Sequence, residues 1–141
     1  MTEMDEKSLC GKRILLAEDN DISAALISEM FRQYGVLIDR AENGLSALET
    51  MRKSAYGEYK TILMDINMPK MNGLESAGAI RRLGRPDAAH IPIIGITADY
   101  PYQNSKDEAA AHGITDFIPK PINSAGFFKI RNYLLAYSQN I

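Results

Sequence analysis

Four short apolar segments of the sequence each end at polar side chains that could take part in chemistry. In chain order, these side chains are Glu18 with Asp19, Asp65, Thr97 and Lys120. Parallel strands of an open α/β sheet place their carboxyl ends along one edge, so these groups would meet in one crevice. Three carboxylates, a hydroxyl and an ammonium together suit a divalent cation and a phosphoryl group.

Asp65 is the strongest candidate for a reactive group. It follows residues 61–64, which have strand character, and Pro69 and Gly73 then turn the chain into a loop. An aspartate carboxylate can attack a phosphoryl group directly and form an acyl phosphate. Phosphoryl transfer depends mainly on positioning and charge neutralisation. A divalent cation and the compact positive charge of Lys120 would supply both.

Glu18, Asp19 and Asp65 form the candidate metal site. Like charges at close range oppose joint ionisation, and a bound divalent cation relieves that repulsion. An all-oxygen ligand set that leaves room for water suits Mg²⁺. The acidic pair could instead serve as a simple helix cap, because Asp19 and Asn20 precede a predicted helix. Capping does not explain why both acids face the same edge as Asp65.

Thr97 and Lys120 also have purely structural interpretations. Thr97 could be an ordinary β-branched strand residue, and Lys120 could be a surface lysine with a solvated head. Pro119 and Pro121 favour a functional role for Lys120, because prolines on both sides fix the backbone that aims it.

The composition excludes several classes of function. A chain of 141 residues with 45% hydrophobic and 24% charged residues supports one globular domain. A net charge of −2 and the lack of a basic helix give no indication of nucleic-acid binding. No apolar run is long enough for a membrane span, and there is no signal peptide. The single cysteine, Cys10, excludes an internal disulfide and fits a reducing, cytoplasmic location.

The elements that must position these groups alternate between strand and helix patterns five times. This alternation implies right-handed crossovers and a parallel sheet with helices on both faces. Polar residues 1–11 lack periodicity and are predicted to be a flexible leader. The helix predicted at 102–112 has only a thin stripe of alanines as its apolar face, which predicts local mobility. Strands are predicted at residues 13–17, 36–41, 61–64, 92–97 and 116–118, and helices at about 22–34, from 44, at about 74–83, at about 102–112 and from 123 or 124.

Two helices have clear apolar spacing. Ile22, Leu26 and Met30 recur at helical intervals in the first helix, and the last helix is predicted to bury apolar residues at 127, 130 and 134.

Four motifs occur in order: Glu18 with Asp19, Asp65 with Met68-Pro69 and Gly73, Thr97-Ala98, and Lys120-Pro121. In this combination the chain resembles the receiver domain of two-component response regulators over residues 11–137. The motifs are weak singly and specific together. The resemblance implies a flavodoxin-like doubly wound (βα)5 three-layer sandwich whose parallel five-stranded sheet has the order 2-1-3-4-5. It places the receiver domain at 12–138 and a tail at 139–141.

The same resemblance assigns the metal ligands. Asp65 would be the phosphoacceptor and Mg²⁺ the cofactor. Asp19 and Asp65 would contact the metal through their carboxylates and Asn67 through its backbone carbonyl. Glu18 would contribute directly or through water.

Three further roles follow from the resemblance. Lys120 would reach a phosphate oxygen, and its peptide bond to Pro121 would be cis, as is often the case in the family. Thr97 would donate its hydroxyl to a phosphoryl oxygen. Phe117 would be the switch aromatic that turns inward as Thr97 moves, although it can equally be plain core.

The implied function is that of a phosphoacceptor in a two-component phosphorelay. Asp65 would take a phosphoryl group from a phosphohistidine, and the face formed by the fourth helix, fifth strand and fifth helix would switch. The chain would not be a turnover enzyme, since it would catalyse only its own Mg²⁺-dependent phosphorylation and dephosphorylation. Two other functions remain open. A degenerate receiver acting as an interaction module would not need all five site residues. An aspartate-nucleophile phosphohydrolase needs an acid where Asn67 stands.

The partners implied are a histidine kinase core, a histidine phosphotransfer domain, or both. They would bind through the first helix, where Ala24 and Ala25 are small enough to admit a partner helix, and through the loops around Asp65. Residues 9–20, 64–69 and 120–122 look like the receivers of hybrid sensor histidine kinases. A receiver from such a kinase is therefore favoured over a single-domain regulator.

Overall fold

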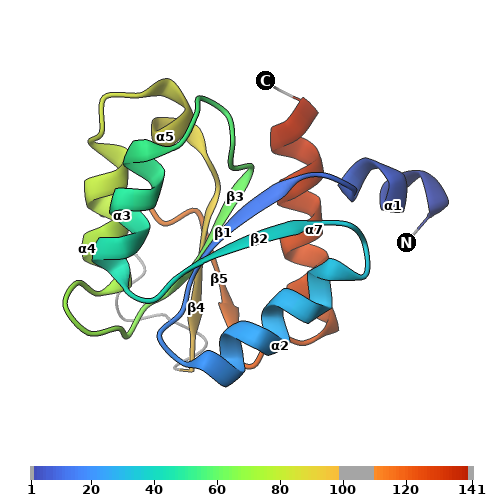
Figure 1. Cartoon of the computed structure of the whole chain (residues 1–141), viewed down its shortest axis with the longest axis horizontal. Coiled ribbons are helices and arrows are strands. Elements are labelled where there is room, and N and C mark those ends of the chain that lie inside the picture. Colours follow the sequence, from blue (N-terminus) through green and yellow to red (C-terminus); the bar gives the residue numbers. More distant parts are fainter. Residues whose placement is uncertain (1, 99–109, 140–141) are drawn as a thin grey trace.

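Five short apolar segments form one parallel sheet (Figure 1). The computed structural model describes residues 2–98 and 110–139. The sheet order is β2-β1-β3-β4-β5, as the resemblance implies. Every residue of β3 and β4 is buried, because central parallel strands are covered on both faces. The strands are β1 (Arg13–Ala17), β2 (Leu37–Ala41), β3 (Thr61–Asp65), β4 (Ile93–Thr97) and β5 (Asp116–Pro119).

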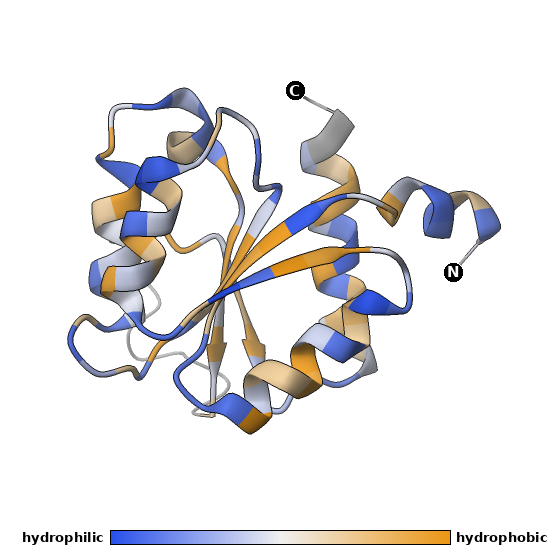
Figure 2. Cartoon of the chain, viewed as in Figure 1, coloured by the Kyte–Doolittle hydropathy of each residue, from blue (hydrophilic) through white to orange (hydrophobic). Residues whose placement is uncertain are grey.

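Helices cover both faces of the sheet (Figure 1). Helices α3 (Gly44–Lys53) and α4 (Gly73–Arg81) lie on one face, and α2 (Asp21–Arg32) and α7 (Ser124–Gln139) lie on the other. Neighbouring residues of each strand contribute to opposite cores, since strand side chains alternate between faces. The strands are accordingly largely hydrophobic (Figure 2).

An asparagine caps three of these helices and sets where each begins. The side chains of Asn20, Asn43 and Asn72 accept hydrogen bonds from the backbone N–H groups three residues later. Each cap lies shortly after a strand ends, so the chain turns from strand into helix near one edge of the sheet. This arrangement leaves the residues at the carboxyl ends of the strands at that edge.

The buried face of α2 differs from the predicted apolar spacing. Ala24, Ile27 and Phe31 are buried, whereas Ile22 and Leu26 are 73% and 66% exposed. The apolar residues of α2 therefore extend beyond the strip that the sheet can cover, and two of them face solvent. The prediction for α7 is confirmed, since its apolar residues at 127, 130 and 134 are buried.

The flexible leader predicted for residues 1–11 is wrong, because Glu3–Leu9 form helix α1. Thr2 and Asp5 make a reciprocal capping box at its start. Leu9 is fully buried in the core that α2 and α7 share. Arg131 of α7 lies 4.0 Å from the Asp5 carboxylate. A helix cap, one buried leucine and the contact with Arg131 thus hold a segment that has no apolar periodicity.

One further helix was not predicted, and one predicted helix is not tested. Pro86–His90 form the short helix α5, a segment for which the sequence analysis predicts no helix. The helix predicted at 102–112, with its expected mobility, lies mostly outside the described residues.

Candidate metal and phosphoryl site

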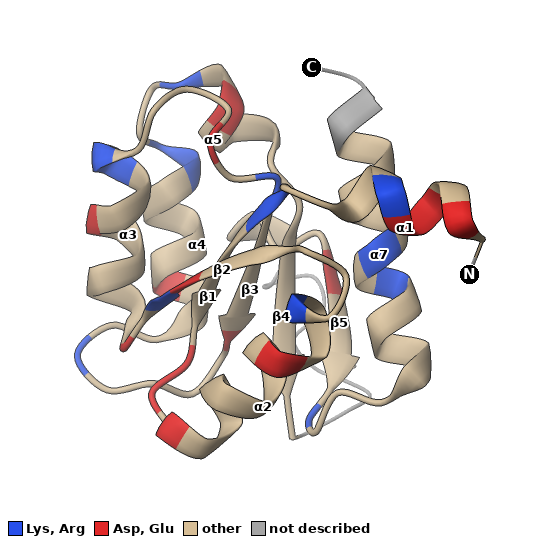
Figure 3. Cartoon of the chain, turned by 45° about the vertical axis from the view of Figure 1, so that its right-hand side comes forward, with Lys and Arg blue, Asp and Glu red and all other residues tan. Residues whose placement is uncertain are grey.

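The strand register brings the predicted site residues to one edge of the sheet. Ala17 of β1 pairs with Met64 of β3, so Glu18 follows β1 at the level where Asp65 ends β3. Thr97 at the end of β4 pairs with the last residue of β5, which directly precedes Lys120. Figure 3 shows acidic residues gathered where β1 and β3 end.

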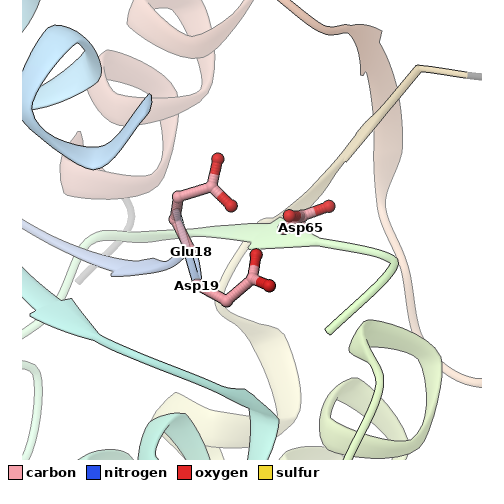
Figure 4. A group of neighbouring side chains, drawn as sticks. All are labelled: Glu18, Asp19 and Asp65. Atoms are coloured by element: carbon pink, nitrogen blue, oxygen red, sulfur yellow. The ribbon is translucent and has the colours of Figure 1, made fainter. Parts of the chain in front are cut away.

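The carboxylates of Glu18, Asp19 and Asp65 converge on a common space (Figure 4). Each offers one oxygen, and these oxygens all lie within 4.8 Å of one another. Glu18 is only 1% exposed, and its backbone N–H donates to the Ala41 carbonyl at 3.0 Å. Asp65 is 5% exposed, and Asp19 is open to solvent. The cluster therefore has two buried acids and one that faces water.

Lys120 joins this cluster from the far end of the chain. Its Nζ donates to Glu18 Oε1 at 2.7 Å and to Asp65 Oδ2 at 3.2 Å. Its backbone N–H donates to the Thr97 carbonyl at 2.9 Å. The Lys120-Pro121 peptide bond is cis, as the resemblance implies. Lys120 thus supplies one positive charge between the two buried carboxylates.

Burial sets the electrostatics of this pair. Loss of hydration raises the pKa of the Glu18 carboxyl, and the nearby Asp65 raises it further against the opposing effect of Lys120. Burial by itself would lower the pKa of Lys120, but its hydrogen bond to Glu18 and the two negative charges raise it overall. Lys120 therefore stays protonated at neutral pH, and one ammonium faces more than one acid.

The donor set fits Mg²⁺. Glu18 Oε2 is buried and has no hydrogen-bond partner within the described part of the chain. A buried carboxylate oxygen without a donor is costly, and a cation would satisfy it. The ligands are all oxygen, and the exposed side of Asp19 leaves room for the waters that Mg²⁺ usually keeps. Asn67, the fourth predicted ligand, follows directly on this edge, and its N–H donates to Asp65 Oδ1 at 3.3 Å.

A family model of the response regulator receiver domain matches residues 14–130. The chain belongs to the response regulator receiver domain family. The sheet order and the acidic edge described above are those that the receiver resemblance predicts.

Curated relatives of this receiver domain include hybrid histidine kinases. Hybrid signal transduction histidine kinase I of Dictyostelium discoideum is 33% identical over 132 residues, which are 92% of this chain and 8% of that protein. Hybrid signal transduction histidine kinase B of the same organism is 34% identical over 123 residues, with coverages of 81% and 6%. The receiver domain thus spans less than a tenth of the length of these two relatives.

Solved structures similar to this receiver domain include one with bound metal. The receiver domain of a sensor histidine kinase from Pseudomonas aeruginosa, with a magnesium ion in its active site cleft, is 27% identical. Its TM-score is 0.76, and the alignment covers 90% of this chain and 99% of that one. A Mg²⁺ complex of a histidine kinase receiver domain from Arabidopsis thaliana is 25% identical with a TM-score of 0.77, at coverages of 91% and 95%. No helix within residues 2–98 and 110–139 is long and apolar enough to cross a membrane.

The two predicted switch residues of the receiver domain are both buried. Thr97 ends β4 at the site, and Phe117 lies on the neighbouring strand β5. The Phe117 ring packs over Gly95, where an added Cβ would lie 2.5 Å from a ring carbon. Phe117 is therefore turned inward and is part of the core in this structure.

Arg40 is a site neighbour that the sequence analysis missed. Its Nε donates to the Glu18 carbonyl at 2.9 Å, and its Nη1 pairs with Asp21 Oδ1 at 2.6 Å. Arg40 thereby ties the end of β1 to the first turn of α2. The only signal in the sequence is a basic residue near the end of the short strand β2. The contact of Arg40 with Glu18 depends on the register between β1 and β2.

The raised pKa of Glu18 predicts a pH effect on the Mg²⁺-free receiver domain. The folded protein keeps the Glu18 proton to a higher pH than the unfolded chain does. The free energy of unfolding should therefore fall as the pH rises from about 4.5 through the raised pKa of Glu18. Glu18→Gln should remove this slope, while Lys120 stays charged throughout. Thermal denaturation of both proteins from about pH 4 to 8 measures the difference. Parallel pH profiles would contradict the prediction.

Proposed function

We propose that Asp65 of this receiver domain accepts a phosphoryl group from a phosphohistidine, with Mg²⁺ held by Glu18, Asp19, Asp65 and the Asn67 carbonyl. The observation that carries the proposal is the contact of Lys120 with both Glu18 and Asp65 at an edge lined by three carboxylates. A lysine and three acids at the ends of parallel strands neutralise charge and position a phosphoryl group, which this chemistry requires.

In the proposed step an Asp65 carboxylate oxygen forms a bond to phosphorus as the P–N bond of the phosphohistidine breaks. The electron pair of that bond stays with the imidazole nitrogen, and a proton on the other ring nitrogen leaves the imidazole neutral. Bound Mg²⁺ supplies positive charge to the carboxylates and the phosphoryl oxygens. Lys120 Nζ, already 3.2 Å from Asp65 Oδ2, donates to a phosphoryl oxygen. The Thr97 hydroxyl donates to another.

Acetyl phosphate with Mg²⁺ tests the proposed function. A receiver should form one acyl phosphate per chain and should stop there, apart from slow hydrolysis. Continuous rapid release of phosphate would indicate a phosphohydrolase instead. Absence of any phosphoprotein would indicate an interaction module, and either result would refute the proposal.

The exposed face of α2 is the proposed docking surface for a histidine phosphotransfer domain. Ile22 and Leu26 lie on it, and a cavity of about 260 Å³ runs from α2 to the end of β5. This cavity reaches Lys120, which contacts Asp65, so a phosphohistidine on a docked partner would lie next to the acceptor. Full burial of one leucine stabilises a complex by about 1.5–3 kcal/mol. The cavity is lined by Ser23, Leu26, Ile27, Met30, Lys120, Pro121 and Ile122.

Leu26→Arg should slow phosphoryl transfer from a phosphotransfer domain by about tenfold or more, because it places a charge in this apolar contact. Phosphorylation by acetyl phosphate should be unchanged. Leu45→Arg on α3, where the leucine is 45% exposed, is the matched control and should behave as wild type in both assays. A panel of phosphorylated phosphotransfer domains provides the donors. Equal transfer to both variants from every donor that phosphorylates the wild type would show that α2 is not the docking surface.

Thr97 and Phe117 are proposed to carry the signal from Asp65 to β5, α7 and the segment between β4 and β5. A phosphoryl oxygen offers the Thr97 hydroxyl a bond worth about 1.5–3 kcal/mol. That free energy biases a two-state element without remaking the core. Amide exchange with and without beryllofluoride should change around residues 97–118, and Thr97→Ala should reduce the change. Exchange differences confined to the surroundings of Asp65 and Glu18 would count against this coupling.

The similarity to hybrid histidine kinases supports a further proposal about the parent protein. We expect this receiver domain to act with a histidine kinase core encoded in the same reading frame. The sequence of the surrounding gene tests this directly. An open reading frame that encodes no kinase core would show that this receiver domain belongs to a separate regulator.

A further inference from the structure

The loop between β3 and α4, residues 66–72, is bonded to the first residue of α3. The Gly44 N–H donates to the Met71 carbonyl at 3.1 Å. The Ser76 hydroxyl, from the first turn of α4, donates to the Gly44 carbonyl at 2.7 Å. Both Gly44 and Ser76 are buried. Both the N–H and the carbonyl of Gly44 are therefore hydrogen-bonded to the segment that follows Asp65.

Two glycines, Gly44 and Gly73, lie very close to backbone atoms of this loop or of Asp65. A Cβ at Gly44 would lie 2.3 Å from the Met71 carbonyl oxygen, and a Cβ at Gly73 would lie 2.4 Å from the Asp65 carbonyl oxygen. The Gly73 N–H also donates to the Ile66 carbonyl at 2.9 Å. The loop thus approaches the Gly44 and Gly73 backbones closely, so a shift of α3 would be felt directly by the segment that follows Asp65.

The Ser76 hydroxyl is the side-chain group that bonds directly to the Gly44 backbone. Ser76 is fully buried, and alanine in its place would lack only the hydroxyl oxygen. Its hydroxyl therefore matters for the bond that it makes to Gly44 rather than for the space that it fills.

We propose that Ser76 is a positioning residue for phosphorylation of Asp65. Its hydroxyl fixes the Gly44 backbone, Gly44 fixes Met71, and this chain of bonds sets the loop that carries Asn67 next to the Asp65 carboxylate. Small displacements of reacting groups have large effects on rate. The inference rests on the proposed function of Asp65 and adds to it a residue on another element that determines how the acceptor is aligned.

Ser76→Ala tests the proposal, with Thr61→Val as the matched control. Thr61 is also fully buried, and its hydroxyl donates to the Lys60 carbonyl at 2.7 Å at the opposite end of β3. Each variant loses one hydroxyl hydrogen bond of 2.7 Å, so both should lower the melting temperature. Only Ser76→Ala should slow phosphorylation by acetyl phosphate at saturating Mg²⁺, on the order of tenfold. Only Ser76→Ala should speed amide exchange in residues 66–73.

A wild-type rate in Ser76→Ala, or an equal slowing in Thr61→Val, would overturn the positioning role. If the wild-type chain itself takes no phosphoryl group, the proposed function fails, and the exchange comparison still decides whether Ser76 holds the loop. Should Ser76→Ala not fold, Ser76→Cys keeps a similar volume with a weaker donor, and the same comparisons with Thr61→Val apply.

Discussion

Replacing Asp65 with asparagine should abolish phosphorylation of this receiver domain. The amide is nearly isosteric with the carboxylate, so the buried strand end should keep its packing, but the amide is not a nucleophile for phosphorus. The substitution also removes one of the three carboxylates that converge at the site. Labelling with a radioactive small phosphodonor in the presence of Mg²⁺ measures the effect. We expect a loss of at least about a hundredfold.

Asp116→Asn is the control for the loss of one aspartate charge. Asp116 lies in β5, where its carboxylate accepts from Lys129 and Tyr133, away from the acidic edge. This variant should be labelled like the wild type. Undiminished label in Asp65→Asn, stable to hydroxylamine, would show that another residue is the acceptor and that the proposed chemistry is wrong.

Asp19→Ala should weaken Mg²⁺ binding by at least about tenfold and reduce phosphorylation accordingly. Asp19 is the exposed member of the carboxylate cluster, so its removal should leave the core intact. The Mg²⁺-free variant should be at least as stable as the wild type, because fewer like charges face one another. A Mg²⁺ titration and thermal denaturation without metal measure these two effects.

Glu29→Ala provides the matched loss of charge on the exposed surface of α2, where Glu29 pairs only with Arg32 among the described residues. Its Mg²⁺ affinity should equal that of the wild type. An unchanged affinity in Asp19→Ala would remove Asp19 from the ligand set and would leave the two buried acids as the carboxylate ligands.

The site was largely predictable because its residues follow apolar segments, and parallel strands align their carboxyl ends. Glu18, Asp65, Thr97 and Lys120 needed no knowledge of side-chain packing to be grouped together. The contacts of Arg40, and those of Ser76 with Gly44, depend instead on register and on how closely two backbones approach. Nothing in the local sequence around Ser76 indicates either quantity.

Helices were harder to predict than strands, both in the face that they bury and in where they occur. The apolar residues of α2 cover more of its circumference than the sheet can bury, so their spacing alone did not identify Ile22 and Leu26 as exposed. Helix α1 was missed because a single buried side chain, Leu9, anchors it, and one apolar residue has no period.

The position of Lys120 after the last strand has a consequence for biosynthesis. Lys120 and Asp65 are 55 residues apart, and β5 is an edge strand that pairs with β4 alone among the described strands. A ribosome makes both buried acids well before it makes the cation that faces them. A nascent chain should therefore become able to accept a phosphoryl group only once β5 has emerged and paired. Chains stalled at increasing lengths should acquire the label abruptly at that point.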